Sequence, residues 1–426
     1  MNFFKAFYLT GATTVLVTII SFFNNVFVTR FLGAEGRGKY SIVMNIVMIL
    51  SLIFGEGLRR GNVIFVGRSK ANISRVVART LIYTLVLVLF FLPLVYYKNL
   101  VLVNLLKINY DLISLALYLA AILIFWRALQ SIFLGIEDYN KFNIIQLAYT
   151  SLFFTFNVIV IYVVKAGLTE IILSFFLSSV IVSVISLFWI KQIKSASKNE
   201  KSESDSKGII IKATLASIFG YLLLKSDIFL VNYFTNNTNT GIYSITLVIT
   251  DLFQKLPLIL APIVIARSVN KEEKKEILNI AKMSRVLVLM NFLAILFIIL
   301  FGREIISLLF SNQFDLSFEL LIYILPALLI FSSGHIINAF FMGQGFPFIV
   351  ILNSLLFSII NIIMNIIFIP KFGVVAAAIN CSLSYILWSI TFIIYFSMKY
   401  DVPIITLLVV NKKDILELRM KLLTHG

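Results

Sequence analysis

The chain contains about twelve apolar stretches that are each long enough to cross a lipid bilayer. A helix needs about 20 mostly apolar residues to span the hydrocarbon core. The 426 residues are 60% hydrophobic and only 13% charged, and a mean hydropathy of +1.00 excludes an ordinary soluble domain. The sequence therefore predicts an all-α integral membrane protein. The expected spans are 8–30, 40–58, 78–97, 112–134, 142–164, 170–190, 211–234, 241–265, 284–301, 319–341, 346–369 and 373–397.

Basic residues divide unevenly between the two sides of these spans. If the N-terminus is cytoplasmic, 25 of the 36 Lys and Arg fall in cytoplasmic segments and 8 in external loops. Such an excess marks the cytoplasmic side, so we expect a multi-pass protein of a plasma membrane with both termini in the cytoplasm. Positive charge spread over loops also argues against nucleic acid as a partner. The loop expected after the second span carries Arg59, Arg60, Arg68, Lys70, Arg75 and Arg79.

One phrase occurs twice in the sequence, at 31–42 and, 203 residues later, at 234–245. Each copy reads Phe, six variable residues, Gly, one residue and Tyr-Ser-Ile, and each joins two long apolar stretches. Six spans in each half would give both halves the same orientation. Parallel repeats of this kind build transporters whose substrate path lies between the halves. The sequence thus predicts two parallel six-helix lobes around a central cavity.

Polar segments mark the expected boundaries of the lobes. We expect an N-terminal six-helix lobe at 1–190, a cytoplasmic linker at 191–210, a C-terminal six-helix lobe at 211–397 and a cytoplasmic tail at 398–426. The linker is rich in Ser, Lys and Glu and has no apolar period, which is typical of a flexible tether. The tail alternates apolar and charged residues, which predicts an amphipathic helix on the inner leaflet.

Enzyme chemistry has no visible basis in the sequence. The chain has two histidines, His335 and His425, a single cysteine, Cys381, and no P-loop sequence for ATP. No expected external loop is longer than about 20 residues, which leaves no room for an extracellular catalytic domain. We expect no enzyme and no cofactor or metal site, with Na⁺ or H⁺ as a coupling ion.

Three basic side chains lie within expected spans and away from their ends. Ionisable groups at membrane depth cost several kcal/mol unless they are paired or hydrated, so Arg127, Lys225 and Lys255 are candidate ligands for an anionic substrate. His335 corresponds to Arg127, 208 residues earlier in the other half, and is a fourth candidate. In an alternative interpretation Arg127 extends to the inner headgroups, with Trp126 at the interface.

Two acids in the second half are candidate cation-coupling residues. Asp251 lies four residues before Lys255, so the two side chains can pair along one helix face. Asp227 is two residues from Lys225, so these two cannot pair directly. Structural contacts between helices are the alternative role for each of them.

The inner end of the second span carries a further acid and two bases. Glu56 precedes Arg59 and Arg60 by three and four residues. We expect Glu56 to pair with one of these arginines, and Glu56 and Arg59 are candidates for an inner gate.

The phrase at 29–40, Thr-Arg-Phe-Leu-Gly-Ala-Glu-Gly-Arg-Gly-Lys-Tyr, together with the twelve spans and the repeat, resembles the polysaccharide-exporter (Wzx-type) flippases. These belong to a superfamily that also contains the multidrug and toxin extruders (MATE) and the lipid II flippases. The resemblance implies a MATE-like fold and a lipid-linked oligosaccharide flippase. Its substrate would be an undecaprenyl-pyrophosphate-linked glycan, which moves from the inner to the outer leaflet of a bacterial plasma membrane by alternating access.

The sequence departs from the lipid II flippases at one position. Gly55-Glu56-Gly57 is similar to them, but they carry Arg in the first span, where this chain has Asn24 and Asn25. These two amides are therefore candidate substrate ligands for a different glycolipid. Membrane lipids, a polysaccharide polymerase and glycosyltransferases are the further partners that the resemblance implies.

Two other functions stay open at this point. A multidrug or small-molecule cation antiporter of the same fold would favour acids over bases near its substrate. A membrane factor that holds glycosyltransferases without transport would show no activity in proteoliposomes.

Overall fold

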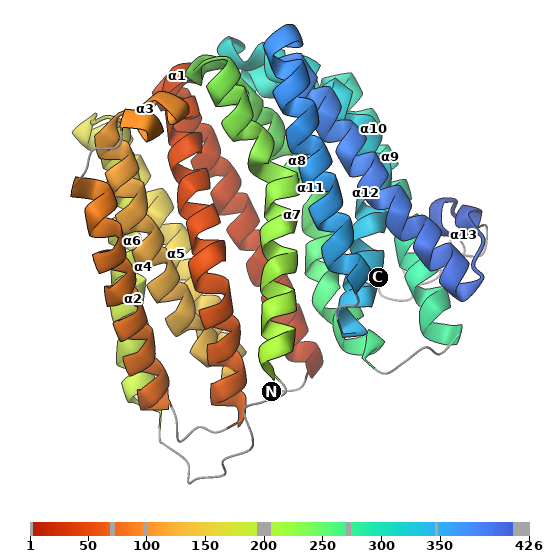
Figure 1. The fold of residues 1–426 in the computed structure, drawn as a ribbon, viewed down its shortest axis with the longest axis horizontal. Helices are drawn as coiled ribbons and strands as arrows, with labels where there is room; N and C mark the ends of the chain where they lie inside the picture. Colours follow the sequence, from red (N-terminus) through yellow and green to blue (C-terminus); the bar gives the residue numbers. More distant parts are fainter. Residues whose placement is uncertain are drawn as a thin grey trace, which may run out of the picture. The chain divides into compact units, whose positions relative to one another are not determined.

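The computed structural model describes residues 3–68, 73–96, 100–193, 206–269, 274–345 and 348–411, and these residues are helical apart from short turns (Figure 1). Eleven helices among them are long and apolar enough to cross a membrane. The helices are α1 (Phe3–Arg68), α2 (Ile73–Tyr96), α3 (Leu100–Leu106), α4 (Tyr110–Gly135), α5 (Tyr139–Ile159) with the π-helical turn η2 (Val160–Val164), α6 (Leu168–Lys191), α7 (Ser206–Phe234), α8 (Asn237–Ser268), α9 (Lys274–Phe310), η3 (Asn312–Phe314), α10 (Asp315–Gly343), α11 (Phe348–Phe372), α12 (Val374–Tyr400) and α13 (Ile404–Leu408).

Helix α1 contains the first two expected spans. Its apolar part, Tyr8–Gly67, has 60 residues, and 1.5 Å per residue gives about 90 Å, three times the hydrocarbon thickness. Gly33 breaks the helix with φ 64° and ψ −176°, a conformation that glycine adopts without a steric cost. Counting α1 as two spans brings the eleven segments to the twelve that the hydropathy predicts, so the expected all-helical membrane architecture is confirmed.

The loop expected between the second and third spans is shorter than predicted. Helix α1 continues to Arg68 and α2 begins at Ile73, and the prediction that this stretch is a basic loop is therefore wrong for the five arginines, which lie on helices: Arg59, Arg60, Arg68, Arg75 and Arg79. Lys70 lies outside the described residues. Hydropathy detects the edge of the hydrocarbon core, whereas a helix continues into the polar headgroup region as long as its side chains reach water or a partner.

The chain divides into two compact units, one formed by 1–218 with 236–241 and the other by 219–235 with 242–426. In the first unit α4 is the most buried span and packs against α1, α2 and α6. In the second unit α10 is the most buried span and packs against α9 and α12. Helices α4 and α10 are the fourth spans of their halves, so each copy of the repeat builds its core around the same helix.

A close helix crossing joins the two copies of the repeated phrase within the first unit. A Cβ added to Gly38 would lie 1.8 Å from the carbonyl oxygen of Asn237, and a Cβ added to Gly241 would lie 1.9 Å from that of Ala34. Ala34 and Asn237 are equivalent positions of the repeat, as are Gly38 and Gly241. The contact is therefore reciprocal, and it requires the shared glycine of the phrase.

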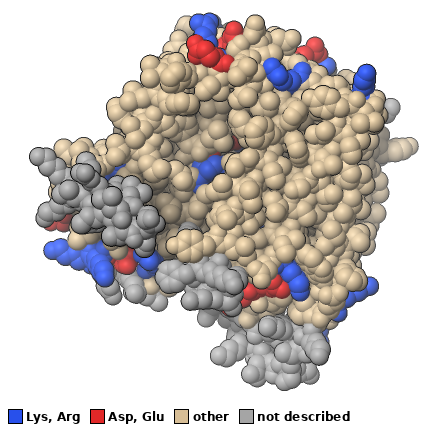
Figure 2. Space-filling model, turned by 180° about the vertical axis from the view of Figure 1, so that it is seen from behind, with Lys and Arg blue, Asp and Glu red and all other residues tan. Residues whose placement is uncertain are grey.

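The surface suits a lipid environment. On the face drawn in Figure 2, uncharged side chains cover a wide area and charged ones gather mainly toward the margins. Large apolar side chains such as Leu89 and Leu300 are 63% and 68% exposed, which is unfavourable in water and favourable against lipid tails.

The linker and the tail are described only in part. Linker residues 194–205 and tail residues 412–426, which include the predicted amphipathic helix, lie outside the described residues. The start of the tail packs against α9 through α13, where the Ser284 hydroxyl donates to the Leu407 carbonyl at 2.7 Å.

Candidate functional site

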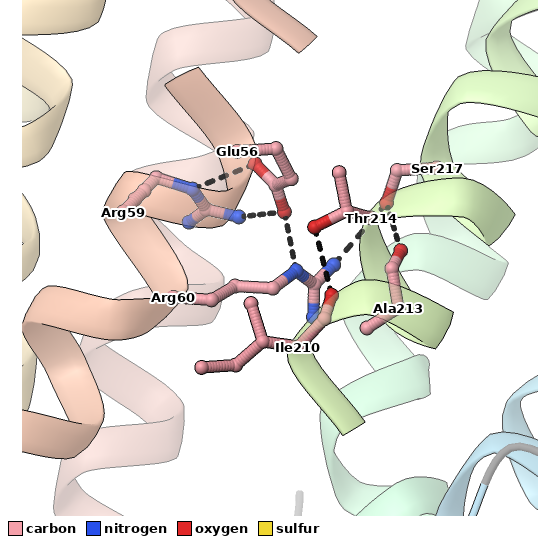
Figure 3. Close-up of polar contacts among 7 residues, drawn as sticks. All are labelled: Glu56, Arg59, Arg60, Ile210, Ala213, Thr214 and Ser217. Carbon is pink, nitrogen blue, oxygen red and sulfur yellow. Dashed lines mark hydrogen bonds and ion pairs between the residues drawn. The ribbon is translucent and has the colours of Figure 1, made fainter. Parts of the chain in front are cut away.

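A cluster of one acid and two arginines lies in the second half of α1, where the second expected span ends (Figure 3). Positions 56, 59 and 60 share one face of α1 because residues three and four apart are neighbours on a helix. The Glu56 carboxylate accepts two hydrogen bonds from Arg59, at 2.7 and 2.9 Å, and Arg60 Nε lies 2.8 Å from the same carboxylate. The prediction that Glu56 pairs with a nearby arginine is correct, and it pairs with both.

Helix α7 contributes a polar contact to this cluster. The Arg60 guanidinium donates to the Ser217 hydroxyl at 3.2 Å (Figure 3), and that hydroxyl donates onward to the Ala213 carbonyl at 3.0 Å. Glu56 is 8% exposed. One carboxylate thus neutralises one of two cations, and the cluster keeps a net charge of +1.

Arg127 lies close to this cluster and increases its positive charge. Glu56 and Arg59 are within electrostatic range of Arg127, and the Arg127 guanidinium lies 5.7 Å from the Trp126 ring. No described acid is within ion-pairing distance of Arg127. Two arginines therefore contact one carboxylate and a third lies within electrostatic range of it, an arrangement that favours binding of an anion.

Trp126 does not face the surface of the first unit. Its side chain is fully buried and stacks on Tyr149 with ring centroids 4.7 Å apart. The buried indole therefore cannot serve as an interface anchor beside Arg127, because stacking within the first unit covers it.

The two asparagines of the first span have separate roles. Asn24 is 5% exposed and its side-chain oxygen accepts a hydrogen bond of 2.8 Å from Asn157 on α5. Asn25 donates to the Ser21 carbonyl one turn earlier on its own helix, also at 2.8 Å. Asn24 thus connects two helices of the first unit, while the Asn25 amide hydrogen-bonds within α1.

In the second unit Lys225 and Asp251 form an ion pair. The ammonium of Lys225 on α7 lies 2.8 and 3.0 Å from the two carboxylate oxygens of Asp251 on α8. The predicted pair between Asp251 and Lys255 is wrong, because the lysine of the neighbouring helix reaches the carboxylate instead. Lys255 is half-buried and has no ion pair with a described residue.

Asp227 lies in the interior of the second unit. It is 0% exposed, it accepts a hydrogen bond from the Tyr243 hydroxyl, and it accepts another from its own helix at the Ile228 amide, 2.9 Å away. No described cation lies within ion-pairing distance of this carboxylate. A buried carboxylate without a counter-ion requires a proton or a cation to be stable.

His335 lies among aromatic rings of the second unit. Its ring centroid is 4.5 Å from that of Phe331 and 5.0 Å from that of Trp388, and Phe331 stacks on Tyr385. Its Nε2 atom is buried without a hydrogen-bond partner among the described residues. The sequence correspondence of His335 with Arg127 is thus not matched by a similar environment, since Arg127 lies beside charged groups.

Two partners of the candidate residues were missed by the sequence reasoning. Tyr243 belongs to the repeated phrase, and its position in the phrase is the signal that could have singled it out. Asn157 lies in an apolar span, where any amide needs a partner. Among the described residues no group of three His, Cys, Asp or Glu side chains could hold a metal ion.

Comparisons with known proteins identify the family and the fold. A family model described as polysaccharide biosynthesis protein matches residues 4–266, whereas a comparison with curated protein sequences gives no match. A solved MOP superfamily transporter from Pyrococcus furiosus Vc1, whose binding pocket is described as having reverse polarity, has a TM-score of 0.68 and 17% sequence identity. The match covers 93% of this chain and 96% of that one.

Two further structures belong to multidrug resistance MATE family transporters of the same superfamily. The inward-facing structure has a TM-score of 0.68 at 16% identity, over 93% of this chain and 98% of that one. The outward-facing structure has the same TM-score at 17% identity, over 93% and 96%. The MATE-like fold is thus confirmed. Because the family model covers more than half of the sequence, this multi-pass membrane protein belongs to the polysaccharide biosynthesis protein family.

Proposed function

We propose that the chain is a flippase for an undecaprenyl-pyrophosphate-linked oligosaccharide in a bacterial plasma membrane, with both termini in the cytoplasm. The observation that carries the proposal is the excess of positive charge around Glu56, where Arg59, Arg60 and Arg127 gather in the membrane-spanning part of the first unit. A pyrophosphate carries several negative charges and offers the paired oxygens that a guanidinium binds in a forked geometry. Family membership supports the same class of substrate.

In the proposed mechanism Arg127 makes the first contact with the headgroup. Arg59 is held by two hydrogen bonds to Glu56 and Arg60 by Glu56 and Ser217, so before the substrate binds these two arginines supply a positive background. Arg127 has no described ion-pair partner, and its guanidinium is therefore available to phosphate oxygens. Glu56 and Arg59 act as the inner gate, since a bound anion competes with Glu56 for the arginines.

The second unit supplies two lysines in different states. Lys255 has no described ion pair, and Lys225 is held by Asp251. In the proposed exchange, a substrate phosphate takes Lys225 and the released Asp251 carboxylate takes up H⁺ or Na⁺. His335, Asn24 and Asn25 are secondary polar contacts for the glycolipid in this proposal.

Asp227 is the second proposed cation-coupling residue. Its buried carboxylate has hydrogen-bond donors in Tyr243 and the Ile228 amide but no described cation within ion-pairing distance. Binding and release of H⁺ or Na⁺ at this group would change the free energy of the second unit and so bias alternating access. A polysaccharide polymerase and glycosyltransferases are the proposed partners that use the exported lipid.

A multidrug cation antiporter is the second candidate, and the MATE-like fold favours it. The test reconstitutes the full chain in proteoliposomes with two substrates, a labelled undecaprenyl-pyrophosphate oligosaccharide and a lipophilic cationic dye. Movement of the glycolipid between leaflets without dye transport is expected. Dye transport driven by an ion gradient without glycolipid movement would establish the antiporter instead, and inactivity toward both would favour a non-transporting membrane factor.

A further inference from the structure

Helix α2 carries a groove on its lipid-facing side that has one basic end. The groove has a volume of about 480 Å³, and the described residues that line it are Arg75, Ala78, Arg79, Ile82, Tyr83 and Val86. These positions recur at three- and four-residue spacing and form one stripe along the helix. Both arginines lie in the first two turns of α2, and the rest of the stripe is apolar apart from the Tyr83 hydroxyl.

Arg79 is held in place from the interior of the first unit. Its guanidinium donates to the Asn62 side-chain oxygen at 2.9 Å and lies 4.5 Å from the Phe65 ring. Asn62 is 0% exposed, and its amide donates to the Thr80 hydroxyl and to the Ala128 carbonyl, each at 3.1 Å. Arg79, one of the two charges at the basic end of the groove, is therefore held by side-chain contacts.

Arg75 supplies the second charge of this end. It is exposed and has no ion pair with a described residue. At the other end, the Tyr83 hydroxyl donates to the Phe54 carbonyl at 2.7 Å, which holds the ring against α1 and leaves the apolar stripe open. The 11-residue distance from Arg75 to Val86 corresponds to about 16 Å of helix, close to the hydrocarbon depth of one leaflet.

We propose that this groove binds one anionic phospholipid, with the phosphate on Arg75 and Arg79 and an acyl chain along Ile82 and Val86. The charge excess of the segment around α2 sets its basic end on the cytoplasmic side, where anionic lipids and basic pockets between membrane helices meet. The lipid would bridge α2 to α1 through the Arg79–Asn62 contact. This site is separate from the cluster around Glu56 and does not depend on the transported substrate.

Native mass spectrometry of the detergent-purified full chain tests the proposal, with phosphatidylglycerol and phosphatidylcholine as probes. Phosphatidylglycerol is expected to bind more tightly than phosphatidylcholine. Arg75→Gln should lower that affinity about fivefold, the value of one basic residue near an anionic headgroup, and should leave phosphatidylcholine binding unchanged. Arg267→Gln, which removes an exposed charge near the end of α8, is the matched control and should have no effect.

The apolar half of the groove needs its own variant. Val86→Trp should fill the groove and weaken phosphatidylglycerol binding, whereas Leu89→Trp, at an exposed position outside the groove, should not. Equal binding of the two lipids, equal effects of Arg75→Gln and Arg267→Gln, or equal effects of the two tryptophan variants would overturn the proposal. Stronger binding of undecaprenyl pyrophosphate than of phosphatidylglycerol at Arg75 would overturn it too, in favour of the transported lipid.

Discussion

Lys225 on α7 donates to both carboxylate oxygens of Asp251 on α8, at 3.0 and 2.8 Å. The pair connects the two helices that flank the second copy of the repeated phrase, and it leaves Lys255 without a described counter-ion. The side chains of Lys225 and Asp251 are 17% and 37% exposed, so water screens the pair only in part. A phosphate that approached Lys225 could therefore replace Asp251 as its partner.

Asp251→Asn should separate the stability of this pair from its role in transport. Because Asp251 is about one-third exposed, we expect a loss of no more than about 1 kcal/mol in the free energy of unfolding. The unpaired Lys225 should bind an anionic headgroup more tightly and release it more slowly. Binding of the glycolipid and the rate of its movement, measured together in proteoliposomes, check this: tighter binding with slower movement supports the exchange, and unchanged values for both contradict it.

The acid of the first unit is expected to contribute more to stability. Glu56→Gln removes the counter-charge of Arg59 and Arg60 at an 8% exposed site, and breaking such a pair typically costs about 3 kcal/mol. Glu35→Gln is the control, since Glu35 is 64% exposed in its pair with Lys39 and exposed pairs contribute little. Thermal unfolding in detergent should show a clear drop for Glu56→Gln alone, and similar small drops for both variants would argue against a structural role for the cluster.

The reciprocal glycine crossing makes a sharp prediction about folding. Ala at position 38 or 241 would place a Cβ within 2 Å of a backbone oxygen, and backbone cannot yield as a flexible side chain does, so each variant should lose about 3 kcal/mol. Gly220→Ala is the control, because nothing lies within 4 Å of its added Cβ. Thermal unfolding that shows equal stability for Gly38→Ala and Gly220→Ala would contradict the crossing.

Replacement of Asn24 and of its neighbour Asn25 by Ala should have different effects on stability. Asn24→Ala removes a buried hydrogen bond to Asn157, and such bonds between membrane helices contribute about 0.6 to 1.7 kcal/mol. Asn25→Ala removes only a bond to its own helix and should be close to neutral. Asn157→Ala in the Asn24→Ala background should add little further loss, and additive losses in this double-mutant cycle would mean that the two amides are not coupled.

The fold could be predicted from the sequence because bilayer thickness imposes a local and countable pattern. The spans follow from apolar length, and the repeated phrase places Gly38 and Gly241 at equivalent positions. The ion pair of Asp251 could not be read in this way, since its partner Lys225 lies 26 residues away on another helix. The rule for residues three and four apart describes one helix only, and a lysine side chain is long enough to reach across to the next.

Burial was the second property that the sequence did not reveal. Trp126 beside Arg127 suggested a membrane interface, but stacking on Tyr149 places the indole in the core of the first unit. Which side of a helix faces lipid depends on its neighbours, and α4 is surrounded by other helices of its unit. The same packing brings Arg127 near Glu56 and Arg59. The sequence does not predict this cluster, because Arg127 lies 71 and 68 positions from these two residues.

The proposed mechanism requires Arg127 as a phosphate ligand, and the most direct test is the rate of glycolipid movement in proteoliposomes that contain the Arg127→Gln variant. A charge-assisted hydrogen bond to phosphate contributes about 1.5 to 3 kcal/mol, so the rate should fall at least about tenfold. The Arg127→Lys variant should recover part of the rate. The control Arg303→Gln, at an exposed position, should move the glycolipid at the parent rate. Unfolding temperatures should match the parent chain. Movement at the parent rate by a folded Arg127→Gln variant would contradict the account.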